Sequence, residues 1–109
     1  MNINYDDFAK LEIKIGTIVS AEVVPDADRL LKLMVDFSEA EPRQIVSGIR
    51  EFFDDIDILV GKQSPFVTNM EPRTIRGLES QGMILAASTD ELFSILSPNQ
   101  ELPSGTLVQ

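Results

Sequence analysis

A long alternating stretch near the N-terminus constrains the fold of this chain more than any other feature. From Leu11 to Val24 the odd positions are mainly apolar and the even positions mainly polar, which is the period of a half-buried β-strand. At about 3.3 Å per residue, this strand would be roughly 46 Å long, which is too long to lie straight in a small domain. Gly16 lies inside the stretch, and a residue without a Cβ permits a bend there. We therefore expect a curved sheet that closes on itself.

The remainder of the sequence indicates short strands separated by turns. Residues 51–62 favour a short helix that ends at Gly61, and 71–81 forms a long connection. Phe37 and Phe66 lie in strand-like segments, and we expect both in the core. The strand-like segments are 31–37, 43–49, 65–70, 82–88, 92–96 and 106–108. This pattern predicts one all-β domain over residues 1–109, a Greek-key barrel of the OB type, with an SH3-like barrel as the alternative.

The types of residue present exclude much catalytic chemistry. The sequence contains 0 cysteines, 0 histidines and 0 tryptophans, so it lacks thiol nucleophiles, imidazole acid–base groups, disulfides and the usual zinc ligands. Asp26 and Asp28 begin like a calcium loop, but Leu30 and Leu31 then occupy positions where such a loop needs an oxygen ligand and a glycine. We therefore expect no metal, no cofactor and no enzymatic activity. Apolar runs are far shorter than the ~20 residues of a membrane span, so we expect a cytoplasmic protein that does not enter membranes.

The charge of the chain is strongly negative but unevenly distributed. Nine basic and 18 acidic residues give a formal net charge of −9, which argues against binding to nucleic acid or anionic membranes. All the basic residues except Lys10 and Lys14 nevertheless lie in segments 29–50 and 62–89. Either these two segments form a functional basic surface, or the bases are scattered over a solvated acidic surface.

The connection from Asn69 to Met83 is the most unusual part of the sequence. Arg73 and Arg76 offer planar donor groups to phosphate, and Asn69 and Ser80 can hydrogen-bond sugars or base edges. Met83 can pack against an exposed base. The same residues also fit an ordinary loop, in which Asn69 satisfies backbone groups, the arginines pair with neighbouring glutamates and Met83 is part of the core. These residues alone leave both interpretations open.

Four motifs follow one another along the chain: VPDADRL at 24–30, IVSGI at 45–49, LVGK at 59–62 and NxxPRxxxGxxSxGM at 69–83. In this order they resemble the tRNA-binding OB domain family. That family includes the C-terminal domain of bacterial methionyl-tRNA synthetases, free-standing tRNA-binding proteins, secretion-chaperone-like proteins and the C-terminal domains of some eukaryotic synthetase cofactors. The resemblance covers the chain from about Asp6 to Val108. DDFAK at 6–10 and SQGM at 80–83 are more similar to the synthetase branch than to the chaperone-like branch.

The resemblance implies a five-stranded OB barrel with a short helix and a C-terminal extension used in homodimerisation. It also implies binding to the outer corner of folded tRNA by shape, without chemistry on the RNA. The chain would then be an accessory subunit or a detached appendage of methionyl-tRNA synthetase, and its own Met1 favours a separately encoded chain. The implied RNA-binding residues are Lys32, Asn69, Arg73, Ser80 and Met83, flanked by Arg29, Arg43 and Arg76 as phosphate-neutralising residues.

The alternative is a chaperone-like dimer that binds peptides or assembles with other proteins and has little affinity for RNA. The net charge of −9 favours this alternative. Thr74 and Glu71 favour it too, because relatives often carry more basic residues there. Phe8, Phe93 and Leu96 are the residues that we assign to the dimer interface, and in this alternative they would carry the function.

Overall fold

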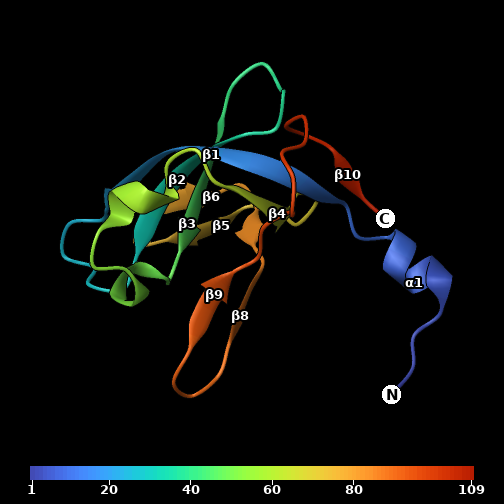
Figure 1. Ribbon diagram of the computed structural model, residues 1–109, viewed down its shortest axis with the longest axis horizontal. Coiled ribbons are helices and arrows are strands. Elements are labelled where there is room, and N and C mark those ends of the chain that lie inside the picture. Colours follow the sequence, from blue (N-terminus) through green and yellow to red (C-terminus); the bar gives the residue numbers. More distant parts are fainter.

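Strand β1 (Ile13–Val23) organises the fold, because three other strands pair with it. In the computed structural model, which describes residues 1–109, these are β2 (Leu31–Asp36), β4 (Gln63–Val67) and β10 (Leu107–Val108). The sheet continues from β2 to β3 (Arg43–Ser47) and from β4 to β7 (Met83–Ile84), and every pairing is antiparallel. Strands β3 and β7 also lie against each other, which nearly closes the sheet (Figure 1). The predicted all-β barrel of the OB type is therefore confirmed.

The irregularity in β1 is a bulge at Val19, whereas Gly16, where we had expected a bend, pairs regularly with Ser64. The first half of β1 pairs with β4 and the second half with β2, and the β2 register shifts between Ile18 and Ser20. Such a bulge increases the local twist of a strand. Gly16 serves a different purpose, since a Cβ at this position would lie 2.5 Å from Cγ1 of Val35. Its missing side chain lets the core pack directly on the backbone.

The core fills the interior of the barrel with aliphatic and aromatic side chains. Phe37 and Phe66 are both buried, as predicted, and their rings meet edge to face with centroids 5.3 Å apart. The other buried members of the main cluster are Ile18, Leu31, Leu33, Val35, Ile45, Ile49, Leu59 and Ile84. Because both phenylalanines are enclosed, neither is available to stack on a ligand.

The helix predicted over 51–62 is replaced by two separate 3₁₀ turns, η1 (Arg50–Phe52) and η2 (Ile56–Leu59). Phe53 lies between them in an extended conformation and packs against the core, which interrupts helical hydrogen bonding. The carboxylate of Asp55 accepts a hydrogen bond from the backbone N–H of Asp57 and begins the second turn. Gly61 follows η2 with a φ of 88°, in the left-handed conformation expected of a helix stop.

Two hairpins were not resolved by sequence analysis. The connection 71–81 contains β5 (Arg73–Ile75) and β6 (Leu78–Ser80), joined by Arg76 and Gly77. Both of these turn residues have positive φ, as a type I′ turn requires. The predicted strand 82–88 is divided between β7 and β8 (Ala86–Ser88), and β8 pairs with β9 (Phe93–Ile95) in a hairpin that projects from the barrel (Figure 1).

A short helix that we did not anticipate, α1 (Tyr5–Ala9), precedes β1 and extends away from the barrel (Figure 1). The side chain of Asn4 caps its N-terminus by accepting a hydrogen bond from the backbone N–H of Asp7 at 2.9 Å. None of the residues of α1 is buried within the chain. Neither this helix nor the 3₁₀ turns have the length and apolar character needed to cross a bilayer.

Candidate nucleic-acid interface

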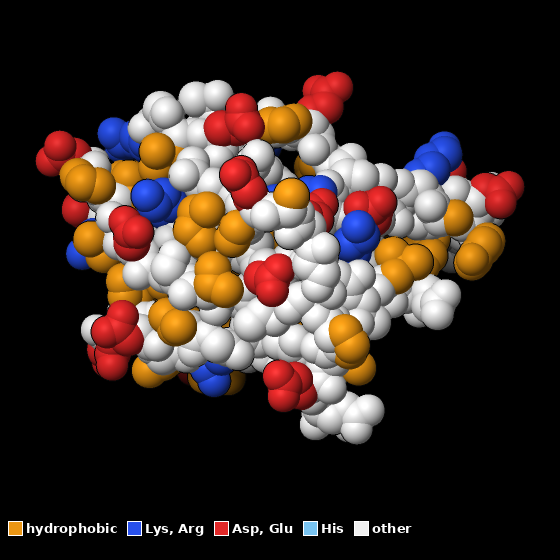
Figure 2. All heavy atoms as spheres, turned by 90° about the horizontal axis from the view of Figure 1, so that it is seen from above, with side chains coloured by type: hydrophobic (Ala, Val, Ile, Leu, Met, Phe, Trp, Pro, Cys, Tyr) orange, Lys and Arg blue, Asp and Glu red, His pale blue; other side chains and the backbone are white.

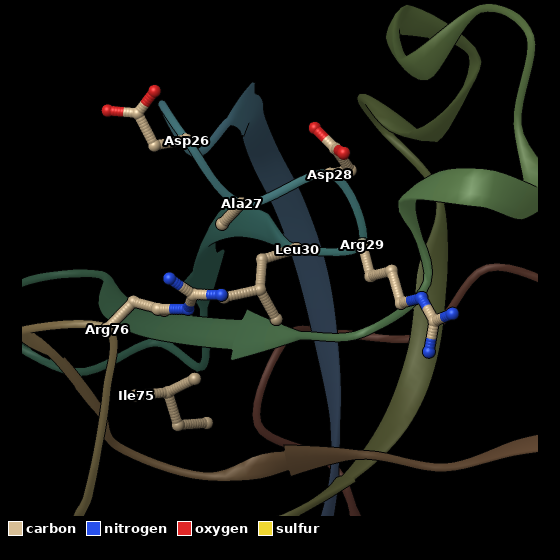
Figure 3. A pocket seen from close by; sticks show the side chains of 7 residues that line it. All are labelled: Asp26, Ala27, Asp28, Arg29, Leu30, Ile75 and Arg76. Carbon is tan, nitrogen blue, oxygen red and sulfur yellow. The ribbon is translucent and has the colours of Figure 1, made fainter.

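The tip of the β5–β6 hairpin faces the loop between β1 and β2 across a hollow of about 380 Å³ (Figure 3). Residues 26–30 of the loop line one side of this hollow, and Ile75 and Arg76 of the hairpin line the other. The hairpin connects the fourth and fifth barrel strands, β4 and β7. In OB barrels the loop between the first two strands and the loop between the last two flank the face that binds oligonucleotides. The β1–β2 loop, which carries Arg29, and the hairpin, which carries Arg73 and Arg76, therefore lie at that face.

Arg73 and Arg76 are exposed on the hairpin, and neither forms an ion pair. The alternative in which they are neutralised by neighbouring glutamates is therefore wrong. The guanidinium of Arg76 extends over the hollow toward Ala27 and Leu30, as Figure 3 shows. These two arginines keep their donors available to an anion.

Arg29 lines the same hollow and Lys32 lies in β2, and each of them is loosely paired with a glutamate. Nε of Arg29 lies 3.9 Å from a carboxylate oxygen of Glu51, with 81% of the arginine side chain exposed. Nζ of Lys32 lies 3.5 Å from an oxygen of Glu22. The Lys32 side chain is 29% exposed and its partner Glu22 is 60% exposed. Ion pairs at the surface stabilise a fold by about 0 to 1 kcal/mol, so a phosphate can compete for either cation.

Met83 is partly exposed at a second, smaller hollow beside the root of the hairpin. Met70 is also exposed there, and the hollow is lined by Arg73 as well. Thioether side chains are soft and adapt to irregular apolar surfaces, so this position can contact a base or a ribose. Met83 is thus at the surface, as the binding interpretation requires, and not enclosed in the core.

Asn69 is exposed, but both ends of its side-chain amide are hydrogen-bonded within the chain. Its Nδ2 donates to the backbone oxygen of Lys10 at 2.7 Å, and its Oδ1 accepts from the backbone N–H of Glu12 at 2.8 Å. The side chain therefore joins the segment between α1 and β1 to the point where the chain leaves β4. This arrangement matches the interpretation in which Asn69 satisfies backbone groups.

Ser80 is also committed to the fold. It is 4% exposed, and its Oγ accepts from the backbone N–H of Val46 and donates to the backbone oxygen of Gly82, each at 3.0 Å. The bond from Val46 attaches the hairpin to β3, and the bond to Gly82 is local. Ser80 lines the smaller hollow beside Met83, but its hydroxyl is already hydrogen-bonded within the chain.

Arg43 binds groups of its own chain with most of its donors. Nε and Nη2 donate to the two carboxylate oxygens of Glu39, each at 2.8 Å, and Nη1 donates to the backbone oxygens of Thr68 and Gln81. The hydrogen bond to Glu39 raises the pKa of Arg43, and the same contact lowers the pKa of Glu39. Among the eight predicted RNA contacts, the structure leaves Arg29, Arg73, Arg76 and Met83 exposed and Lys32 half-buried, and it engages Asn69, Ser80 and Arg43 in hydrogen bonds within the chain.

The net charge of −9 is also apparent on the face of the molecule seen in Figure 2. Figure 2 shows acidic side chains spread over the visible face, with basic side chains at separate places and no continuous basic patch. Any attraction for an anion therefore arises from a few local cations and not from a broad positive field.

A sequence model described as "Putative tRNA binding domain" matches residues 13–107. The chain belongs to this family of tRNA-binding domains. Methionine–tRNA ligase from Methanococcus aeolicus is 45% identical over 106 residues, which cover 97% of this chain and 15% of that protein. Methionine–tRNA ligase from Lactococcus lactis is 40% identical over 107 residues, covering 97% of this chain and 16% of that protein. The chain thus spans about one sixth of the length of the curated relatives that it matches.

Solved structures show the same architecture for this tRNA-binding domain. A MetRS-related protein from Pyrococcus horikoshii superposes with a TM-score of 0.91 at 34% identity, covering 100% of this chain and 99% of that one. The chaperone CsaA from Bacillus anthracis superposes with a TM-score of 0.88 at 30% identity, covering 100% of both chains. The domain is therefore similar both to a synthetase-related protein and to a protein described as a chaperone.

The three residues that we predicted at a dimer interface differ in their surroundings within the tRNA-binding domain. Phe93 stacks on Phe52 with ring centroids 4.3 Å apart and packs edge to face against Phe53, so much of its surface is used inside the chain. Phe8 is exposed on α1, and Leu96 is exposed just after β9. Figure 1 shows α1 and the β8–β9 hairpin projecting from different parts of the barrel. A single chain therefore does not bring these residues together.

Sequence analysis missed the polar network at the root of the hairpin. Oγ1 of Thr68 donates to the carboxylate of Glu12 at 2.7 Å, which lowers the pKa of Glu12. The backbone N–H of Gln81 donates to the backbone oxygen of Gln44, and the backbone N–H of Gln44 donates to Oε1 of Gln81. Partners separated by 37 to 56 residues leave no local pattern in a sequence. The run of polar residues at 79–81 was the one feature of the sequence that could have indicated this network.

Proposed function

We propose that this chain is a non-catalytic tRNA-binding module that assists methionyl-tRNA synthetase as an accessory subunit or as an appendage. The observation that carries this proposal is the pair of unpaired arginines, Arg73 and Arg76, on a hairpin at the oligonucleotide-binding face of an OB barrel. Membership of a tRNA-binding family and similarity to methionine–tRNA ligases support it. In this proposal the module holds RNA and leaves the chemistry to the synthetase.

Recognition depends on the shape of the phosphate backbone. The two arginines project from a short hairpin whose ladder and type I′ turn fix their relative positions. Guanidinium groups bind phosphate oxygens with two parallel hydrogen bonds, so a fixed pair selects a fixed phosphate spacing. Phe37 and Phe66 are buried, which removes the aromatic side chains of the barrel strands as stacking platforms for single-stranded bases. A folded RNA with a rigid backbone fits this arrangement better than a flexible strand.

The module binds weakly by itself and acts by holding tRNA close to the synthetase. Few phosphates are neutralised, and each contact contributes a slope of roughly −0.7 to −0.9 in the dependence of log affinity on log salt. The net charge of −9 further lowers the attraction at long range. A second weak contact still raises the capture of tRNA, because it converts release from the enzyme into local rebinding at a high effective concentration.

A homodimer would present two such hairpins. Helix α1 buries none of its residues against the barrel, and Tyr5, Phe8 and Leu11 expose apolar surface. Covering this surface with a second copy would remove it from water and stabilise the pair. Leu96 adds exposed apolar surface beyond β9. The dimer in turn fixes the distance between two RNA-binding hairpins, which favours a large folded RNA.

The proposal is tested by comparing folded tRNA with a simple RNA hairpin of equal length at low salt. We expect tRNA to bind the wild-type protein at least several-fold more tightly, because only the folded molecule presents phosphates at the spacing of the two arginines. The molar mass of the protein, measured in the same buffer, reports the dimer. Equal affinity for the two RNAs would refute recognition by shape.

A second candidate function is binding of unfolded peptides, and two observations favour it. The chain is similar over its whole length to the chaperone CsaA from Bacillus anthracis. Leu92 and Phe52 also expose apolar side chains near the β8–β9 hairpin. If this function applies, the protein slows the aggregation of an unfolded client, and replacing Arg73 and Arg76 by alanine leaves that activity unchanged.

A further inference from the structure

The hairpin that carries Arg73 and Arg76 leaves the barrel at Thr68 and returns to it at Gln81. Strand β4 ends one residue before Thr68, and β7 begins two residues after Gln81. Nη1 of Arg43 donates a hydrogen bond to the backbone oxygen of Thr68 at 2.7 Å and another to the backbone oxygen of Gln81 at 3.1 Å. Nη1 of Arg43 therefore joins the two ends of the hairpin segment.

Glu39 holds the guanidinium of Arg43 in the orientation that this junction needs. Its two carboxylate oxygens accept from Nε and Nη2 at 2.8 Å each, a bidentate pair that fixes the plane of the group. The guanidinium also lies 5.6 Å from the centre of the Phe37 ring, whose side chain is part of the core. Of the five N–H donors that an arginine carries, these contacts use all but one.

The contacts beside Arg43 attach the returning strand to β3. Gln44 and Gln81 exchange two hydrogen bonds, one between their backbones at 2.8 Å and one from the Gln44 N–H to the Gln81 side chain at 2.9 Å. Nε2 of Gln44 also donates to the backbone oxygen of Glu79 at 2.9 Å. These bonds restrain the C-terminal half of the hairpin, whereas Arg43 joins that half to the N-terminal root.

We propose that Arg43 is a positioning residue, which, held by Glu39, ties the two ends of the hairpin together so that Arg73 and Arg76 meet RNA in a fixed orientation. This inference rests on the proposed RNA-binding function and changes the role of Arg43 from a phosphate contact to a support. A phosphate would have to displace Glu39 or two backbone carbonyls to reach its donors. Its positive charge is already balanced by a carboxylate at hydrogen-bond distance.

The two roles predict opposite effects of removing Glu39. If Arg43 contacted phosphate, Glu39→Ala would release the guanidinium and raise the affinity for tRNA. If Arg43 supports the hairpin, the same change removes the bidentate contact that orients its guanidinium, and the affinity for tRNA falls by about tenfold. Glu41→Ala is the matched control, because Glu41 is exposed in the same loop and makes no side-chain hydrogen bond or ion pair.

Arg43→Lys separates charge from geometry. Lysine keeps the positive charge but has three donors on one nitrogen, so it cannot reproduce the four hydrogen bonds that the planar guanidinium makes from three nitrogens. We expect a loss of tRNA affinity comparable to that of Glu39→Ala, with the salt slope of the wild type, because the number of phosphate contacts is unchanged. Amide hydrogen exchange in residues 73–80 should become faster in both variants, while exchange in β1 and β2 stays slow.

These measurements distinguish failure of this inference from failure of the proposed function. If the wild type does not bind tRNA, the proposed function fails, and hydrogen exchange in residues 73–80 still decides whether Arg43 restrains the hairpin. If Arg43→Lys does not fold, Glu39→Ala decides alone, since Glu39 lies in a loop outside the barrel strands. Higher tRNA affinity in Glu39→Ala, or unchanged exchange in the hairpin of every folded variant, overturns the inference.

Discussion

The side-chain amide of Asn69 joins two distant segments, donating to the backbone oxygen of Lys10 at 2.7 Å while its Oδ1 accepts from the backbone N–H of Glu12. Asn69→Ala removes both bonds, and we expect it to lower the free energy of unfolding by about 1 to 2 kcal/mol. Urea unfolding measures this change. Asn99→Ala is the control, because Asn99 is exposed and its side chain makes no hydrogen bond. Equal stability of the two variants would contradict the anchoring role.

Ser64 and Ser80 are both buried, but only Ser80 has hydrogen-bond partners. Ser64 is 0% exposed and its Oγ has none, so a polar atom is held in the core without compensation. Ser64→Ala is expected to raise the free energy of unfolding by about 1 kcal/mol. Ser80→Ala leaves the backbone N–H of Val46 without an acceptor and should lower stability by about 1 to 3 kcal/mol. Thermal or urea unfolding shows the result, and changes of the same sign would contradict this explanation.

Gly77 and Gly105 both have positive φ, at 80° and 89°, but their surroundings differ. A Cβ on Gly77 meets open space, so Gly77→Ala costs only the left-handed conformation, about 1 to 2 kcal/mol. A Cβ on Gly105 would collide with the backbone oxygen of Phe37. Gly105→Ala should therefore cost about 1 to 3 kcal/mol more than Gly77→Ala in the free energy of unfolding. Equal losses in urea unfolding would show that the C-terminal segment does not pack on Phe37 in this way.

Stability should fall as the pH is lowered through the acid range because of Glu12 and Glu39. The hydrogen bond from Thr68 lowers the pKa of Glu12, and the hydrogen bond from Arg43 lowers the pKa of Glu39. A carboxyl group whose folded pKa is lowered stabilises the fold above its unfolded pKa, near 4.5, and loses this contribution as the pH falls through the folded pKa.

Glu39→Gln provides the test of this pH dependence. The variant should be less stable than the wild type at pH 7, and the difference should shrink as the pH falls below 4.5, the ordinary pKa of Glu39. Urea unfolding at a series of pH values measures both effects. Glu41→Gln serves as the control for loss of an exposed carboxylate. A difference between wild type and Glu39→Gln that does not depend on pH would contradict the assigned cause.

The sequence predicted the barrel well because its strands carry a local pattern. The alternation from Leu11 to Val24 predicted the strand β1, although its apolar face does not stay inside: Ile18 is buried, whereas Val19 at the bulge and Val23 beyond it are exposed. The burial of Phe37 and Phe66 followed from their places in strand-like segments. The role of Gly16 was predicted wrongly because a glycine within a strand can mark either a bend or a close approach of side chains to the backbone. The structure shows the second case, since Val35 packs directly over it.

The candidate site was predicted only in part, because residue type does not reveal hydrogen-bond partners. Arg73 and Arg76 are accessible as expected, and they are carried by a hairpin too short for a clear alternating pattern. Asn69 and Arg43 have the same donors as surface residues, but Asn69 bonds Lys10, 59 residues away, and Arg43 bonds Gln81, 38 residues away, in addition to its nearby partner Glu39. Such pairings depend on how the barrel closes, which no short motif encodes.

The most direct test of the account is the salt dependence of tRNA binding for the wild type and for the Arg73→Ala, Arg76→Ala double variant. We expect the double variant to bind at least tenfold more weakly and to lose roughly 1.4 to 1.8 from the slope of log affinity against log salt, because two phosphate contacts disappear. A Lys10→Ala, Lys62→Ala variant removes the same charge from the C-cap of α1 and from the loop before β4, and should change the slope little. Equal effects of the two double variants, or a wild-type affinity that hardly responds to salt, would contradict the claim that the hairpin arginines hold the RNA.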